Sequence, residues 1–242
     1  MKLRVNNVNA SYEENAVLDN ICIELNEGEF VSLVGSSGVG KTTLFNIIAG
    51  LLTPVSGTVM LDETDVTGKT GYVGYMLQKD MLLPYKTVMD NIALPLVIGK
   101  VKKQEARELV LPYMDEFGLS GYENKYPNML SGGMRQRAAL LRTYMQKKQV
   151  MLLDEPFSAI DGITRAGMHS WYRDIVDRHG LSTILITHDI EEAVSMSDRI
   201  YIMCGKPGKI VDELSIEREG SLQDFMLSEK FLDYKKYIIG RL

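Results

Sequence analysis

The sequence predicts an α/β fold interrupted by a helical insertion, and three observations lead to this expectation. Short apolar segments with strand character recur along the chain and alternate with helical patterns. One of these segments ends in a glycine-rich turn that opens directly into a helix. Between about residues 78 and 149 the strand signals stop and the pattern becomes helical. A sheet-based core carrying an inserted helical part follows from these features.

Six segments are expected to form strands, and several are apolar throughout, as strands covered on both faces are. They are EFVSLVG from Glu29, TVML from Thr58, GYVGYML from Gly71, VMLL from Val150, STILIT from Ser182 and RIYIM from Arg199. The helices expected around them are TTLFNIIAGLL after the first of these strands, a segment around Trp171, and one after the turn THD at residues 187–189. This order favours a sheet with helices on its faces.

The middle and the end of the chain carry helical patterns as well. KKQEARELVLPYMDEFGL from Lys102 is expected to be helical, with Pro112 weakening its continuity, and a second helix is expected from about Gly132. The segment from Ser221 has apolar residues at near-helical spacing and is expected to dock on its own domain, with a partner-binding role as the alternative. We expect one domain over 1–242: a core lobe of 1–77 and 150–220, a helical lobe of about 78–149, and a tail of about 221–242.

Composition narrows the class of protein. The 242 residues are 45% hydrophobic and 24% charged, as in soluble globular proteins, and the net charge of -5 argues against non-specific nucleic-acid binding. The longest apolar stretches, such as IALPLVIG from Ile92, are shorter than the roughly 18 to 20 residues needed to span a bilayer, and no apolar segment follows the basic start. We expect a cytosolic chain. Cys22 and Cys204, which have no metal-ligand spacing, are expected to be buried thiols.

The glycine-rich turn GSSGVGKT matches the P-loop pattern in the strand and helix context that the pattern requires. Its glycines let backbone N–H groups face phosphate oxygens at a helix N-terminus, where Lys41 adds a counter-charge and the Thr42 hydroxyl binds Mg²⁺. A turn without function is the alternative, which the context disfavours. The residues expected to bind nucleotide phosphates are Gly35, Ser36, Ser37, Gly38, Val39, Gly40, Lys41, Thr42 and Thr43.

Two adjacent carboxylates, Asp154 and Glu155, follow the apolar strand VMLL. Neighbouring residues on a strand face opposite ways, so one is expected to reach the metal and the other the attacking water. His188 ends the strand STILIT and is expected at the same sheet edge, as a γ-phosphate contact or, alternatively, as a cap. His169 and His179 are expected at the surface because their helical segment is rich in charge.

The segment LSGGMRQR, from Leu130 to Arg137, resembles the signature of the ATP-binding-cassette (ABC) ATPases, and the other motifs follow in that family's order. The resemblance implies a P-loop fold with a mixed sheet core, an N-terminal antiparallel β part and an inserted helical lobe. It also implies ATP and Mg²⁺ as ligands and a head-to-tail dimer that sandwiches two ATP molecules. Ser131, Gly132 and Gly133 would then bind the ATP held by the other subunit.

The same resemblance implies roles for single residues. Tyr12 would stack on adenine, Gln78 would touch the metal and the water, and Glu155 would polarise the attacking water. His188 corresponds to the switch histidine, and the segment SAID that ends at Asp161 corresponds to the loop that crosses the dimer interface. With Lys41, these residues form the expected catalytic set of Glu155, His188, Gln78 and Lys41, and the expected metal ligands are Thr42, Gln78 and Asp154. Ile160 stands where leucine is usual, and LLRTYM where alanine is commoner, but neither change removes a reacting group.

Within that family the chain is most similar to ATPase subunits of bacterial importers for nitrate, sulfonates, taurine and related solutes. LLPYKTVMDNIALPL from Leu82 and KPGKIVDEL from Lys206 carry this similarity. It implies membrane-spanning permease partners, an extracytoplasmic solute-binding protein, and a place at the cytoplasmic face of the membrane. A permease helix would dock near Gln78 to Asn91, where Met76, Met81 and Met89 either line the groove or belong to the core.

Two alternatives stay open at this point. The same motifs serve ABC exporters, since hydrolysis does not depend on the direction of transport. A soluble ABC ATPase acting on nucleic acid, ribosomes or iron-sulfur assembly is disfavoured, because the chain has neither a second cassette nor a long coiled-coil insertion. The solute is not encoded here, because its specificity belongs to the permease and the binding protein.

Overall fold

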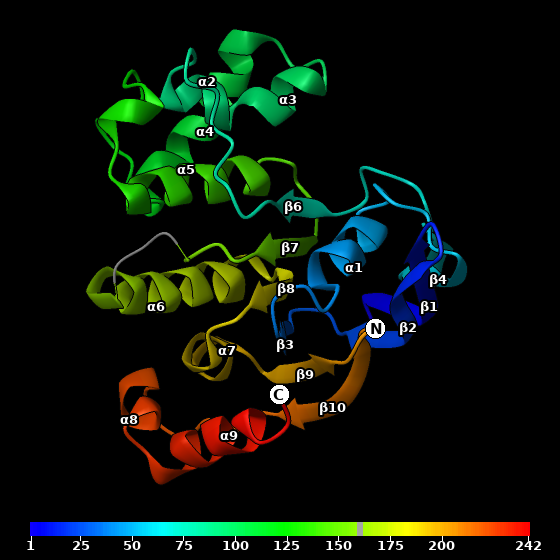
Figure 1. Cartoon of the computed structure of the whole chain (residues 1–242). Helices are drawn as coiled ribbons and strands as arrows, with labels where there is room; N and C mark the ends of the chain where they lie inside the picture. The colour runs from blue at the N-terminus through cyan, green and yellow to red at the C-terminus, as the bar shows by residue number, and fades with distance from the viewer. Residues whose placement is uncertain (159–161) are drawn as a thin grey trace.

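The strands of the protein form two sheets in the computed structural model, which describes residues 1–158 and 162–242 (Figure 1). One sheet has the order β2-β1-β4-β5 and the other β10-β9-β3-β8-β7-β6. The first sheet consists of β1 (Leu3–Tyr12), β2 (Asn15–Leu25), β4 (Ser56–Leu61) and β5 (Thr64–Asp65). The second consists of β3 (Phe30–Gly35), β6 (Gly74–Met76), β7 (Val150–Asp154), β8 (Ser182–Thr187), β9 (Arg199–Cys204) and β10 (Lys209–Ser215).

The second sheet is mixed, as expected, and the first is antiparallel. In the mixed sheet β6, β7, β8, β3 and β9 pair parallel with their neighbours, whereas β10 pairs antiparallel with β9. Every residue of β3, β7 and β8 is buried, which explains why these strands are largely apolar. The carboxyl ends of β3, β8, β7 and β6 therefore lie side by side at one edge.

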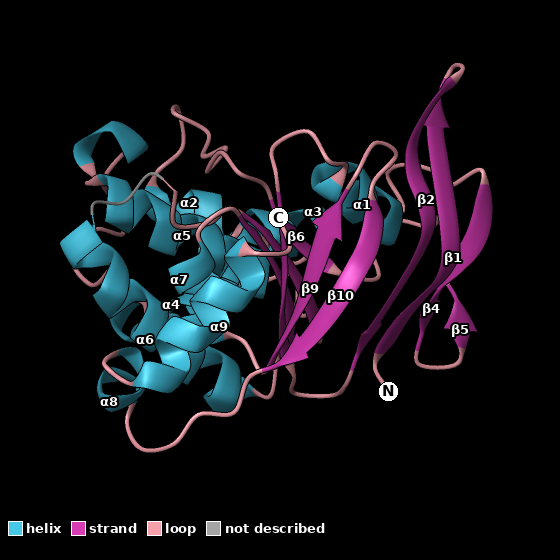
Figure 2. Cartoon of the chain, turned by 60° about the horizontal axis from the view of Figure 1, so that its bottom comes forward, coloured by secondary structure: helices cyan, strands magenta, loops and turns pink. Residues whose placement is uncertain are grey.

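Helices cover both faces of the mixed sheet. Helix α1 (Lys41–Ile48) lies between the two sheets and buries Leu44, Phe45 and Ile48 in the core that they share (Figure 2). On the other face lie α6 (Gly162–His179) and α7 (Ile190–Met196). Each layer thus buries the apolar side of the next.

The chain between β6 and β7 forms a separate group of helices (Figure 1). These are α2 (Val88–Ile92), α3 (Leu94–Ile98), α4 (Lys103–Glu116) and α5 (Gly132–Tyr144), with a 3-10 turn at Pro127–Met129. Pro112 does not interrupt the expected helix, because α4 continues through it. Pro112 lies on the exposed side of the helix, and the buried side is held by Ala106, Val110 and Met114. Tertiary packing therefore outweighs the hydrogen bond that the proline removes.

The C-terminal tail packs on its own chain. It contains α8 (Leu222–Met226) and α9 (Glu229–Ile239), and Phe225, Phe231 and Ile238 share a core with Ala193 and Val194 of α7. Each tail helix begins with a serine whose side chain accepts a hydrogen bond from the third residue after it. The helical docking expected for the tail is present, and α7 is its main contact.

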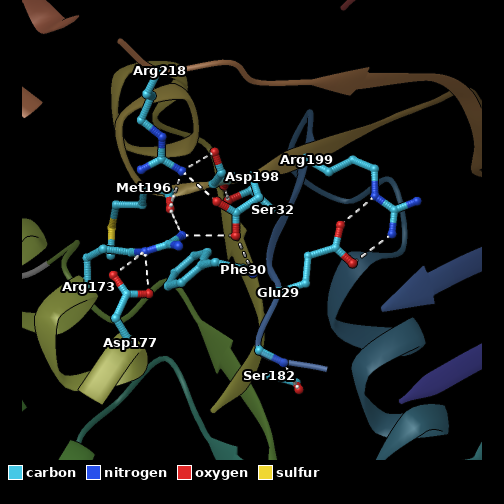
Figure 3. A network of polar contacts seen from close by, with 12 residues as sticks. Glu29, Phe30, Ser32, Arg173, Asp177, Ser182, Met196, Asp198, Arg199 and Arg218 are labelled. Atoms are coloured by element: carbon cyan, nitrogen blue, oxygen red, sulfur yellow. Dashed lines mark hydrogen bonds and ion pairs between the residues drawn. The ribbon is translucent and has the colours of Figure 1, made fainter. Parts of the chain in front are cut away.

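A network of guanidinium groups joins the segment just before the tail to α6 and α7 (Figure 3). Arg218 donates to the carbonyl oxygen of Ser197 at 2.6 Å and to Asp198 Oδ1 at 3.0 Å. Arg173 of α6 donates to the carbonyl oxygen of Met196 at 3.0 Å and to Asp198 Oδ2 at 3.1 Å. Burial and the neighbouring charge of Arg173 lower the pKa of Arg218. The shared Asp198 carboxylate offsets that repulsion and fixes the C-terminal end of α7.

The two cysteines differ from expectation. Cys22 is exposed and Cys204 is half-buried. Cys22 faces solvent because β2 alternates and directs Ile21 and Ile23 inward. Cys204 contacts the end of the tail, where its Sγ lies 3.3 Å from the carbonyl oxygen of Arg241.

Across the described residues, no helix combines the length and the apolar character that a membrane crossing requires.

We expect Phe231→Ala to lower the free energy of unfolding by about 3 to 5 kcal/mol, because Phe231 is only 3% exposed and its loss leaves a cavity between the tail and α7. Leu227→Ala, in the same tail but 88% exposed, is the control and should change it by less than about 0.5 kcal/mol. Urea denaturation measures both. Equal effects of the two variants would contradict the docking.

Candidate functional site

A cavity of about 250 Å³ opens at the edge where the strands β3, β8, β7 and β6 end. It is lined by Val17, Ser37, Gly38, Gly40, Lys41, Thr42, Thr43, Gln78, Asp154, Glu155 and Ile186. Most of these residues were expected from sequence, but Val17 and Ile186 were not, because a single apolar residue in a strand carries no signal of its own. The fold thus brings the glycine-rich turn, both carboxylates and Gln78 to one hollow.

The glycine-rich turn needs glycine where its backbone is unusual. Gly40, which precedes α1, has a φ of 110°, and a Cβ there would lie 2.7 Å from Cδ2 of Leu18. Lys41 is 7% exposed, and its Nζ donates to the carbonyl oxygens of Gly35 at 2.7 Å and Ser36 at 3.0 Å. Burial lowers the pKa of Lys41, and the carboxylates of Glu155 and Asp154 oppose that shift. A cation is thereby held at the N-terminus of a helix, where phosphate is favoured.

Asp154 faces the turn. Its Oδ2 accepts a hydrogen bond from the Thr42 hydroxyl at 3.1 Å, and the residue is 5% exposed. Burial raises the pKa of Asp154, the charge of Glu155 adds to this, and the Thr42 hydrogen bond and Lys41 oppose it. A buried carboxylate beside a hydroxyl is a hard oxygen donor set that fits Mg²⁺, which takes few protein ligands. In the described part of the chain, no group of three or more His, Cys, Asp or Glu side chains has the arrangement of a metal site.

Glu155 lines the same cavity as Asp154 but has two partners of its own. Gln78 Nε2 donates to Glu155 Oε2 at 2.8 Å, and His188 Nδ1 lies 3.0 Å from Glu155 Oε1. Glu155 has a φ of 47°, an uncommon backbone conformation for a residue other than glycine, which costs about 1 to 3 kcal/mol. The adjacent carboxylates therefore have different hydrogen-bond partners, and Glu155 is held by side chains from two other strand ends.

The segment after Gln78 is attached to α5. Arg135 Nε lies 3.3 Å from Asp80 Oδ2, and Arg142 donates to the carbonyl oxygens of Met81, at 2.8 Å, and Asp80. Both arginines lie on one side of α5, since seven residues are about two helical turns. This connection was not predicted from the sequence. The spacing of seven residues between Arg135 and Arg142 is the one signal that could have indicated it.

The remaining expected residues lie elsewhere. Ser131 caps α5 by accepting a hydrogen bond from the N–H of Met134, and neither it nor Gly132 or Gly133 lines the cavity. Tyr12 ends β1 and is 51% exposed. Asp161 lies outside the described residues.

The three histidines have different surroundings. His188 is exposed and borders the site through Glu155. The expectation that His169 lies at the surface is wrong, because the residue is only 7% exposed. His179 is half-buried and lies 3.2 Å from Glu116. The burial of both histidines depends on partners from other elements. The charge of their own helical segment does not indicate those partners.

The comparisons with known proteins agree with this geometry. The profile described as "ABC transporter" matches residues 18–158. The chain is 41% identical over 203 residues to the nitrate import ATP-binding protein NrtD of Synechocystis, covering 84% of this chain and 76% of that protein. It is 34% identical over 246 residues to the taurine import ATP-binding protein TauB of Yersinia pseudotuberculosis, covering 99% and 96%.

A solved structure gives the same result. The dimeric structure of the ATP-binding cassette MJ0796 in a post-hydrolysis state with ADP and Pi superposes with a TM-score of 0.77 and 30% identity, covering 90% of this chain and all of that one. The profile match spans more than half of the chain and includes the glycine-rich turn, Gln78 and both carboxylates. The chain therefore belongs to the ABC transporter family, as one of its ATP-hydrolysing, ATP-binding domains.

Proposed function

We propose that the chain is the ATPase subunit of a bacterial ABC importer for a small solute of the nitrate, sulfonate or taurine kind. One observation carries the catalytic part: the Glu155 carboxylate is held by Gln78 and His188 beside Asp154 and the glycine-rich turn. The import part rests on relatives named for nitrate and taurine import. Exporters share the site, but the relatives named here favour import.

In the proposed reaction the chain positions charges around the γ-phosphate. The N-terminus of α1 and Lys41 bind phosphate oxygens, with Gly35 to Thr43 as the cradle. Thr42, Asp154 and Gln78 would hold Mg²⁺, which when bound neutralises charge on the phosphate oxygens. Glu155 orients the attacking water and accepts its hydrogen bond, and His188, whose Nδ1 faces Glu155, contacts the γ-phosphate through its other edge.

A second copy of the chain would complete each site. Ser131, Gly132 and Gly133 lie at the N-terminus of α5, outside the cavity of their own chain, which suits an anion site offered to a partner's ATP. The dimeric cassette MJ0796 supports this arrangement. The exposed ring of Tyr12 suits stacking on adenine.

The helices α2 to α5 would form the lobe, about residues 78–149, that contacts the permease. Asp80 and Met81 link Gln78 to Arg135 and Arg142 of α5, so a shift of Gln78 is passed to this lobe. Of the three methionines near the expected groove, Met81 is 57% exposed, whereas Met76 and Met89 belong to the core. Tyr85, 72% exposed, adds to the docking surface. The permease would place the chain at the cytoplasmic face and connect it to a solute-binding protein.

The importer proposal is tested by purifying the tagged chain from gently solubilised membranes, with and without ATP, and identifying its partners by mass spectrometry. We expect a polytopic permease, encoded near a solute-binding protein. Recovery with ribosomal or DNA-bound proteins alone would contradict the proposal.

Glu155→Gln should lower the rate of ATP hydrolysis by about 100-fold or more and leave ATP affinity within about threefold, because the amide keeps the shape of the carboxylate but is a poor base. Glu219→Gln, at an exposed position, is the matched control and should keep the full rate. Phosphate release and nucleotide-binding assays measure the two quantities. A wild-type rate in Glu155→Gln would remove Glu155 from the mechanism.

Asp154→Asn should abolish Mg²⁺-dependent hydrolysis and raise the Tm of the nucleotide-free protein. A raised pKa in the folded state means that the charged form of Asp154 is disfavoured there, so stability falls as pH rises through the window between the unfolded and folded values. The amide removes that cost at neutral pH. Thermal unfolding at pH 7 with chelator measures it, and a lower Tm than wild type would contradict this account of Asp154.

A further inference from the structure

Three buried polar side chains lie directly behind His188. Thr187 of β8 is 1% exposed, Glu192 of α7 is 4% exposed, and His169 of α6 is 7% exposed. Each comes from a different element, and none belongs to the cavity that holds the glycine-rich turn. Burying two ionisable side chains is costly, so their partners decide whether the arrangement is stable.

The Thr187 hydroxyl holds the backbone around His188. It donates to Glu192 Oε2 and accepts a hydrogen bond from the N–H of Asp189 at 2.9 Å. The Asp189 side chain caps α7, accepting from the N–H groups of Glu191 at 2.9 Å and Glu192 at 3.2 Å. His188 lies between Thr187 and Asp189, which these hydrogen bonds fix. The Thr187 hydroxyl is in turn fixed by Glu192.

His169 lies beside the carboxylate oxygen of Glu192 that Thr187 does not use. His169 Nε2 and Glu192 Oε1 are 3.3 Å apart, yet neither atom has an aligned hydrogen bond within the described residues. The His169 ring packs edge-on against Phe157, with centroids 5.0 Å apart. A small turn of the imidazole would align its Nε2 with Glu192 Oε1.

The group borders the reacting residues through a small hollow. A cavity of about 40 Å³, wide enough for about one water molecule, is lined by Glu155, Phe157, Ser158, Thr187, His188, Asp189 and Glu192. Glu192 therefore lines the same hollow as Glu155 and His188, and a displacement of Glu192 would alter a wall that all three share.

We propose that His169 and Glu192 are positioning residues for His188: they anchor the Thr187 hydroxyl and so fix the direction in which the His188 ring meets Glu155 and the γ-phosphate. The proposal rests on the role of His188 proposed above. It assigns a purpose to a buried histidine and glutamate that the catalytic set leaves unused.

The test compares His169→Leu, His169→Gln and Thr187→Val in the full chain by steady-state ATP hydrolysis. His169→Leu and Thr187→Val should lower kcat about tenfold with KM for ATP within twofold, since a misplacement of about 1 Å can cost on the order of 100-fold. His169→Gln should return kcat to within threefold of wild type, because its amide nitrogen lies as many bonds from Cα as Nε2 of histidine and can donate to Glu192.

The matched control is His179→Leu, the same substitution at the C-terminal end of α6. His179 Nε2 lies 3.2 Å from Glu116 Oε1, so the same helix forms a similar pair with α4, away from His188. Its kcat should stay within twofold of wild type. An equal loss in His179→Leu, an unchanged kcat in Thr187→Val, or a loss in His169→Leu that His169→Gln does not restore would overturn the proposal.

Two further measurements keep the outcomes distinct. If His169→Leu does not fold, as judged by thermal unfolding, Thr187→Val decides the test because it only exchanges a hydroxyl for a methyl group of similar size. His188→Ala shows which proposal fails: a wild-type kcat there contradicts the role of His188 itself. A large loss in His188→Ala together with wild-type kcat in His169→Leu and Thr187→Val contradicts the positioning role alone.

Discussion

The parallel register of four neighbouring strands is the constraint on which the site depends. Val34 pairs with Thr187, Ile186 with Asp154, and Leu153 with Met76. Each strand therefore ends at the same level, and the next residues of the chain enter one hollow. A slip of one residue in any pair would turn every side chain of that strand to the other face, so the buried apolar pattern protects the register and, with it, the site.

The residues at these strand ends could be predicted because the rule is local: an apolar strand, then a glycine or a polar side chain. The glycine-rich turn, Asp154, Glu155 and His188 were found in this way and lie at the predicted edge. The burial of His169 could not be predicted from the sequence. Its neighbours are Phe157, which precedes α6, and Glu192, which is on α7. Cys22 shows the opposite error, since alternation in β2, rather than composition, decides its exposure. The periodicity of one segment gives no information on which distant residues pack against it.

Helix α7 is held at its first turn by the tail and at its last turn by Arg218, just before the tail, which gives the C-terminal part of the chain a place in the architecture of the site. At its first turn Glu191 pairs with Lys235 of α9, and at its last turn Arg218 binds the carbonyl oxygens of Ser195 and Ser197. Glu191 in the first turn and Arg218 at the C-terminal end have the charges that the helix dipole favours at those positions. Because α7 begins two residues after His188, the tail and the mixed sheet support the same short segment from opposite sides.

The contact between Cys204 and the end of the tail allows movement of the tail to be followed by the reactivity of this cysteine. The Cys204 thiol lies under the carbonyl oxygen of Arg241, while Cys22 stands in the open on β2. A thiol reagent therefore meets two sites of the same chemistry, one always accessible and one shielded by the tail. The ratio of the two modification rates therefore measures how often α9 detaches, without an added label. The modification rate of Cys22 is the internal reference for that ratio.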